Sequence, residues 1–277
     1  MIEDKSNVTI QFPIYGPQHP VISTDMAEIY GEIYDAVKMI FPKEKFSRFF
    51  PLRGSKYDEA IQLSRLTPFE GELFPANEKE AKKYLEPAVR LMVVGRSVNG
   101  WTELMEKTRD EFIQRAAETI VFGGIPWLQD RCVQKILNQM KPITTIEQRW
   151  FEHIVWSELY PIVLLHSRNT MEKMQDVQLA LSKELLLEQI EFYKPTHILF
   201  ITDWDGGFER FADVFSEVSK VENSTKNNVV GVGTYGKAQV VVTVRPENRP
   251  NEDEFVADVC QAYNINNATG KLCEMIE

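Results

Sequence analysis

Runs of apolar residues alternate along this chain with longer stretches whose apolar positions recur every three or four residues. The runs at 91–94, 154–156, 198–202 and 240–244 are almost wholly apolar, which is typical of strands that are covered on both faces. Helical stretches separate these runs. The alternation predicts an α/β fold with three layers, α/β/α, around a mostly parallel central sheet of four strands.

Several stretches carry helical patterns. They cover residues 23–41, 77–86, 102–122, 171–193, 207–218 and 251–263. The first has a good N-cap in Ser23 or Thr24. The helix at 171–193 has the strongest amphipathic pattern, and Pro195 ends it. Residues 46–63 predict a loop followed by a turn of helix.

Length and cysteine content narrow the class of protein. A chain of 277 residues suits one α/β domain, so we expect a single domain over residues 1–277 with a helical N-terminal extension at about 1–85. Cys132, Cys260 and Cys273 form no C-x-x-C pair, which favours a reducing compartment and indicates no metal or redox motif. The N-terminus resembles no signal peptide, and no apolar run could span a bilayer. A soluble, cytoplasmic protein without a cofactor is expected.

Polar residues follow each predicted strand. In a parallel sheet the ligand lies beyond the carboxyl ends of the strands, so these residues should share one rim. They include Arg96, Trp101 and Glu158, the Asp203–Gly206 segment, Arg245 and Arg249. Arginine suits phosphate and tryptophan offers a stacking face, so we expect a ligand there. The alternatives are surface ion pairs for the last two arginines and burial of Trp101 under the next helix.

Other patterns carry less chemistry. The sequence GVGTYG lies between two strands and predicts a hairpin that turns at residues 235–237. The sequence DWDGG fits a capped turn better than a metal loop. The four histidines show no ligand spacing, and His197 is expected in the core. We therefore expect no metal site.

The order of these features resembles the uracil-DNA glycosylase superfamily. Between Arg90 and Tyr263 a strand ends in glycine, and a polar loop and a W-S-x-L strand follow. A long helix that contains glutamine and ends in K-P, the strand ILFIT and a strand that ends in RPENR complete the order. The resemblance implies a DNA-repair hydrolase that cleaves the N-glycosidic bond of a damaged or deaminated base during base excision.

The resemblance also implies roles for individual residues. Gly95 matches the first glycine of the family's first motif, G-Q-D-P-Y or G-M-N-P-G. Ser97 stands where its aspartate or asparagine would be, Glu158 where an asparagine reads the base, and Arg245 where a histidine begins the last motif. Asn99, two places after Ser97, is the better candidate for holding the attacking water.

The implied site therefore has two parts. The catalytic residues would be Asn99, Ser97 and Arg245, and the substrate would be bound by Arg96, Gly95, Glu158, Trp101 and Arg249. The three departures from the family pattern leave a second hypothesis open: an inactive protein that binds a nucleotide, a nucleobase or a nucleic-acid end. The net charge of −10 means that contact with DNA would depend on a local basic rim.

Overall fold

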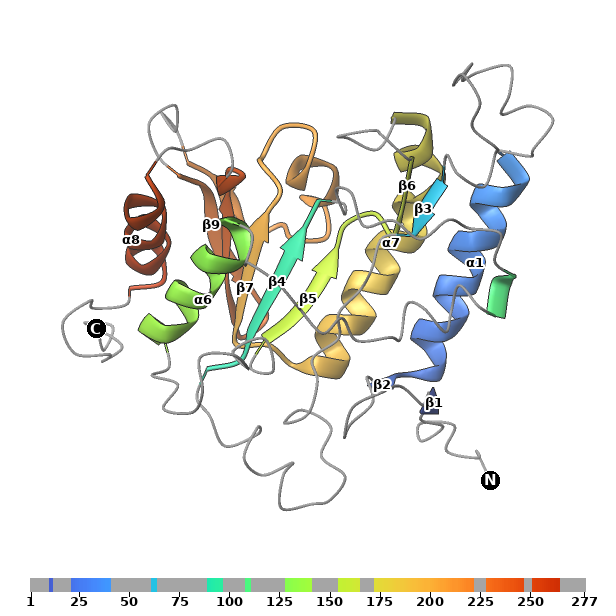
Figure 1. Cartoon of the computed structure of the whole chain (residues 1–277), viewed down its shortest axis with the longest axis horizontal. Coiled ribbons are helices and arrows are strands. Elements are labelled where there is room, and N and C mark those ends of the chain that lie inside the picture. The colour runs from blue at the N-terminus through green and yellow to red at the C-terminus, as the bar shows by residue number, and fades with distance from the viewer. Residues whose placement is uncertain are drawn as a thin grey trace. The chain divides into compact units, whose positions relative to one another are not determined.

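The computed structural model describes residues 10–11, 21–40, 61–63, 89–96, 108–110, 128–140, 154–164, 172–221, 228–246 and 251–264 (Figure 1). The chain divides into two compact units. The first takes Met1–Phe74, Gly95–Thr119 and Trp156–Lys194, and the second takes Pro75–Val94, Ile120–Val155 and Pro195–Glu277. Both contain helices and strands, so the chain is of the α/β class. The expected single domain with an extension at about 1–85 stays a prediction.

The chain forms a mixed sheet of six strands in the order β5-β4-β7-β10-β9-β8, and most of its residues belong to the second unit. The strands are β4 (Leu91–Gly95), β5 (Ile154–Glu158), β7 (His197–Ile201), β8 (Ser219–Lys220), β9 (Val229–Tyr235) and β10 (Ala238–Thr243). All four predicted strands lie in this sheet. It is larger than the expected sheet of four because the tight turn at Gly236 makes β9 antiparallel to β10, and β8 then pairs with β9.

Hydrogen bonds at the strand ends define the strand directions. The carbonyl oxygen of Arg90 accepts from the backbone N–H groups of Thr196 (2.9 Å) and His197 (3.1 Å), so β4 and β7 begin at the same edge. Leu159 N donates to Gly95 O (2.8 Å), so β4 and β5 end together. β10 is parallel to β7. The strand that follows β4 in the chain, β5, lies on one side of β4, and the strands that follow β7 lie on the other side of the β4–β7 pair. The strand order therefore reverses between β4 and β7.

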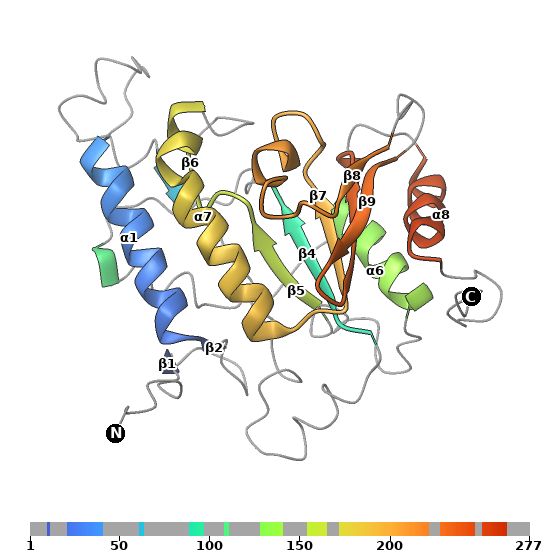
Figure 2. The ribbon, with the colours of Figure 1, turned by 180° about the vertical axis from the view of Figure 1, so that it is seen from behind.

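Two kinds of structure cover the faces of this sheet. Helices α6 (Leu128–Met140) and α8 (Glu252–Ala262) pack side by side, and α8 contacts β9 and β10 (Figures 1 and 2). The ring of His197 on β7 meets Tyr263, just after α8, with ring centroids 5.1 Å apart. Phe200 points to the opposite face and meets Phe208 (4.9 Å) and Phe215 (5.1 Å).

The segment after β7 is not the predicted helix. Only a short 3-10 helix, η2 (Phe208–Phe211), forms, and turns follow it. The backbone N–H groups of Ala212, Val214 and Val218 each donate to the carbonyl oxygen three residues earlier, at distances of 2.9–3.3 Å. The aromatic residues have helical spacing, but they bury against Phe200 while the chain crosses to β8, so no regular helix is completed.

The first unit pairs two long helices, α1 (Thr24–Ile40) and α7 (Glu172–Tyr193). Both confirm the predicted helices. Ser23 is the N-cap of α1, because its Oγ accepts from Met26 N at 3.1 Å. The unit also contains two short strand pairs, β1 (Ile10–Gln11) with β2 (Val21–Ile22) and β3 (Ile61–Leu63) with β6 (Ile162–Leu164).

Some predicted helices are wrong or lie outside the described residues. Residues 61–63 form strand β3 instead of the expected turn of helix, because they pair with β6 far along the chain. The predicted helix at 77–86 lies outside the described residues, as does most of the one at 102–122. Helix α6 was not predicted, although its buried residues recur at helical spacing.

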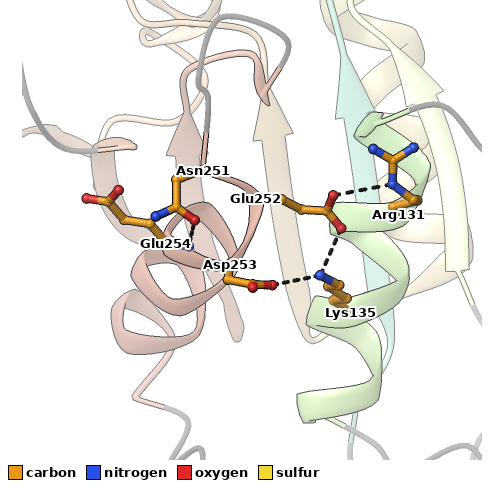
Figure 3. Close-up of polar contacts among 6 residues, drawn as sticks. All are labelled: Arg131, Lys135, Asn251, Glu252, Asp253 and Glu254. Atoms are coloured by element: carbon orange, nitrogen blue, oxygen red, sulfur yellow. Dashed lines mark hydrogen bonds and ion pairs between the residues drawn. The ribbon is translucent and has the colours of Figure 1, made fainter.

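Charged and polar residues join the start of α8 to α6 (Figure 3). Asn251 is the N-cap, with Oδ1 accepting from Glu254 N at 3.2 Å. Glu252 pairs with Arg131 (3.3 Å) and with Lys135 (2.9 Å), and Asp253 pairs with Lys135 (2.7 Å). These acidic residues also interact favourably with the N-terminal end of the helix dipole.

Asn251→Ala is expected to lower the free energy of unfolding by about 1 kcal/mol, because it leaves the N–H group of Glu254 without its cap. Asn251→Asp is the matched control, since aspartate keeps the acceptor and should retain the stability. Urea unfolding of the two variants and the wild type measures the difference. An equal loss in both variants would show that the cap is not the cause.

Candidate functional site

Glu158 lies over Gly95 at the carboxyl ends of β4 and β5. The side chain of Glu158 is buried, with the residue only 7% exposed. A Cβ atom on Gly95 would collide with the carboxylate oxygens of Glu158. Glycine leaves room for the carboxylate in this position, and a larger residue would require the Glu158 side chain to move. The group that lies against Gly95 is thus the side chain of Glu158.

A buried chain of neutral polar groups positions the end of β5. Ser157 Oγ donates to Gln189 Oε1 on α7 at 2.7 Å. Gln189 Nε2 in turn donates to Tyr30 Oη on α1 at 3.1 Å. Burial raises the pKa of the Tyr30 hydroxyl well above its usual value, so the hydroxyl stays protonated. This network ties the residue beside Glu158 to both long helices.

A second group of polar residues lies at the carboxyl ends of β7 and β10. Asp203 N donates to Thr243 O at 3.0 Å, which continues the ladder past the end of β7. Thr243 Oγ1 donates to Phe200 O at 3.1 Å, which links the carboxyl ends of β10 and β7. Arg245 follows β10 and is half-buried. These residues all belong to the second unit.

The DWDGG sequence forms a turn, as predicted, at residues 204–207. Asp205 pairs with Lys220 Nζ at 2.7 Å, and the same ammonium lies 5.9 Å from the centroid of the Trp204 ring. Within the described part of the chain, no group of three histidine, cysteine, aspartate or glutamate side chains could hold a metal ion. The contacts of Asp205 are those of a solvated turn.

His197 is a core residue, as predicted. It is buried at the amino end of β7, and its Nδ1 lies 2.9 Å from Thr196 Oγ1. Burial lowers the pKa of its imidazole from 6.5 to about 4. His197 is therefore neutral at pH 7. It lies at the amino end of β7, whereas the candidate site residues follow the carboxyl ends of the strands.

The structure brings together part of the predicted site. Gly95 and Glu158 are in contact, and Arg96, which directly follows Gly95 in the chain, is half-buried. Ser97, Asn99, Trp101 and Arg249 lie outside the described residues. Their convergence with Arg245 on one rim stays a prediction.

The sequence did not identify the residues that support the site. Gln189 and Tyr30 are 159 positions apart, so no local pattern links them. A signal was available in α7, where polar residues occupy positions on the buried face of the helix. These are Gln178, Ser182 and Gln189. Buried amides at helical spacing indicate a specific hydrogen-bonding role.

None of the described helices combines the length and the apolar character that a membrane span requires. The chain matches no protein-family model and no curated protein.

Proposed function

We propose that this protein recognises a nucleobase at the carboxyl ends of β4 and β5, as a divergent relative of the uracil-DNA glycosylases. The observation that carries the proposal is the buried carboxylate of Glu158 against Gly95. A carboxylate at the end of a parallel strand can accept hydrogen bonds from the ring or amino N–H groups of a base. The proposal includes the finer fold prediction, in which β5, β4, β7 and β10 form the parallel core of an α/β/α domain.

Arg96 supports the same assignment. It directly follows Gly95, so its side chain begins at the end of β4, one residue from the glycine that the carboxylate of Glu158 contacts. Guanidinium groups bind phosphate and also stack on planar rings. The Glu158 carboxylate accepts hydrogen bonds, and the planar Arg96 guanidinium can stack on a ring. Together they suit a base that carries N–H donors.

Hydrolysis of an N-glycosidic bond is the second candidate function. It is favoured by the position of Gly95 at the end of β4, because Ser97 and Asn99 follow it closely in the sequence. In this reaction a water attacks the anomeric carbon, the bond to the base nitrogen breaks, and the base leaves with the bonding electron pair. Asn99 would hold the water.

Glu158→Gln is expected to weaken binding of the preferred base about tenfold or more, because it removes a charge-assisted acceptor. Titration calorimetry with uracil, cytosine, hypoxanthine and xanthine measures the affinity. Glu184→Gln on the exposed face of α7 is the matched control and should bind like the wild type. Urea unfolding checks that both variants remain folded.

The same proteins are then tested on duplexes that contain uracil, hypoxanthine, xanthine or a mismatch. Cleavage by the wild type that Asn99→Ala abolishes would support the hydrolase. Binding of a base without any cleavage would leave base recognition and remove hydrolysis. If no base binds and no duplex is cleaved, both candidate functions are wrong.

A further inference from the structure

Asp203 has an unusual backbone for its place in the fold. Its φ angle is 60°, in the left-handed region that residues with a side chain seldom occupy. Two other described non-glycine residues have positive φ, Lys194 and Asn264, and each follows the end of a helix, where this conformation is common. Asp203 instead follows a central strand. Residues held this way cluster at functional sites.

The surrounding structure holds Asp203 from both sides. Its N–H donates to Thr243 O at 3.0 Å, and its carbonyl oxygen accepts from Phe208 N (3.1 Å) and Thr202 Oγ1 (3.0 Å). Gly207 packs directly against the carbonyl groups of Thr202 and Asp203. Contacts with β10 and η2 therefore hold the backbone of Asp203 in the left-handed conformation. This conformation determines the direction in which its carboxylate leaves the backbone.

The carboxylate of Asp203 is available to a ligand. The residue is partly exposed, and no residue in the described part of the chain forms a hydrogen bond or an ion pair with its carboxylate. Asp205, two positions on, has its carboxylate engaged by Lys220. Asp203 also follows β7 where the strand order reverses, the usual place for a ligand in sheets of this kind.

Arg245 lies at the corresponding position of the neighbouring strand. Thr243 on β10 is opposite Ile201 on β7, and two residues further along these parallel strands are Arg245 and Asp203. A guanidinium and a carboxylate thus follow adjacent strands at the same edge. The first suits a phosphate, and the second accepts from a hydroxyl group.

We propose that Asp203 and Arg245 bind a sugar phosphate with a free hydroxyl group, as in a nucleoside monophosphate. Arg245 binds the phosphate, and Asp203 accepts a hydrogen bond from the sugar hydroxyl. The identity of the sugar as the deoxyribose of a nucleotide rests on the proposed function. The binding chemistry itself rests on the ends of β7 and β10.

Titration calorimetry with 2-deoxyribose 5-phosphate, 2-deoxyribose and inorganic phosphate tests this pair. The wild type should bind the sugar phosphate about tenfold more tightly than phosphate alone, because of the added charge-assisted hydrogen bond. Asp203→Asn tolerates the left-handed backbone but lacks the charge, so it should lose this preference. Arg245→Gln should lose binding of both anions. Asp205→Asn is the matched control and should bind like the wild type.

Thermal unfolding separates a ligand role from a structural one. Asp203→Gly removes the side chain from a left-handed position, so it should raise Tm by about 2 °C or more while it abolishes the preference for the sugar phosphate. A lower Tm in Asp203→Gly, or an unchanged preference in Asp203→Asn, would overturn the proposal. Binding of free bases with no binding of the sugar phosphate would reject this inference alone. The opposite result would reject only base recognition at Glu158.

Discussion

Gly207→Ala is expected to lower the free energy of unfolding by about 3 kcal/mol, because the added methyl group has no space to enter. Its Cβ would overlap the carbonyl oxygen of Thr202 and lie 2.9 Å from that of Asp203. Both obstacles are backbone atoms. Asp203 is fixed by two hydrogen bonds, from its N–H group to Thr243 O and from Phe208 N to its carbonyl oxygen. Relief would require the turn after β7 to move as a whole.

Gly31→Ala is the matched control, since its Cβ would also meet a neighbour at close range. That neighbour is the guanidinium of Arg109, a flexible side chain that is 41% exposed and pairs with Asp35 at 3.0 Å. The guanidinium can move aside, and alanine inside a helix is favoured over glycine by about 1 kcal/mol. Gly31→Ala should therefore be neutral or stabilising. Urea unfolding of both variants decides, and equal losses would contradict the distinction between a backbone and a side-chain obstacle.

Acidification is expected to destabilise the protein through His197 by about 3 kcal/mol between pH 6.5 and pH 4. Burial lowers the pKa of the folded-state imidazole from 6.5 to about 4. The unfolded chain therefore binds a proton in this window while the folded chain does not. The contribution of His197 is complete above pH 6.5 and is lost as the pH falls toward 4.

His197→Phe removes this titration and keeps an aromatic ring against Tyr263, which meets His197 edge-on at 5.1 Å. The difference in free energy of unfolding between the wild type and this variant should shift by about 3 kcal/mol in favour of the variant between pH 7 and pH 4. Urea unfolding at a series of pH values measures it. Parallel pH profiles for the two proteins would show that His197 does not titrate between the folded and unfolded states.

Local patterns in the sequence were sufficient for several elements. The periodicity of α1 and α7, the cap at Ser23, the apolar run of β7 and the turn between β9 and β10 each involve residues close together in the chain. A helix cap or a two-residue turn is decided by neighbouring backbone groups, so the sequence alone could predict it. Helix α6 had the same kind of signal, and its pattern could have been recognised.

The sequence also indicated where polar residues would lie, at the carboxyl ends of the strands, but it could not specify their geometry. Gly95 and Glu158 are in contact only because β4 and β5 end together. Residues 61–63 form a strand because they pair with β6. The segment after β7 does not form a regular helix, because its aromatic residues pack on Phe200.

Three properties of single residues were decided by tertiary structure alone. The left-handed backbone of Asp203 depends on hydrogen bonds from two other elements, the low pKa of His197 on burial in the sheet, and the bonding of Gln189 on a tyrosine from another helix. Each arises from contacts between residues far apart in the chain. The sequence by itself determined which helices and strands could form locally, and the tertiary structure decided their pairing and the environment of each polar group, because backbone preference acts between near neighbours while burial and strand pairing act across the fold.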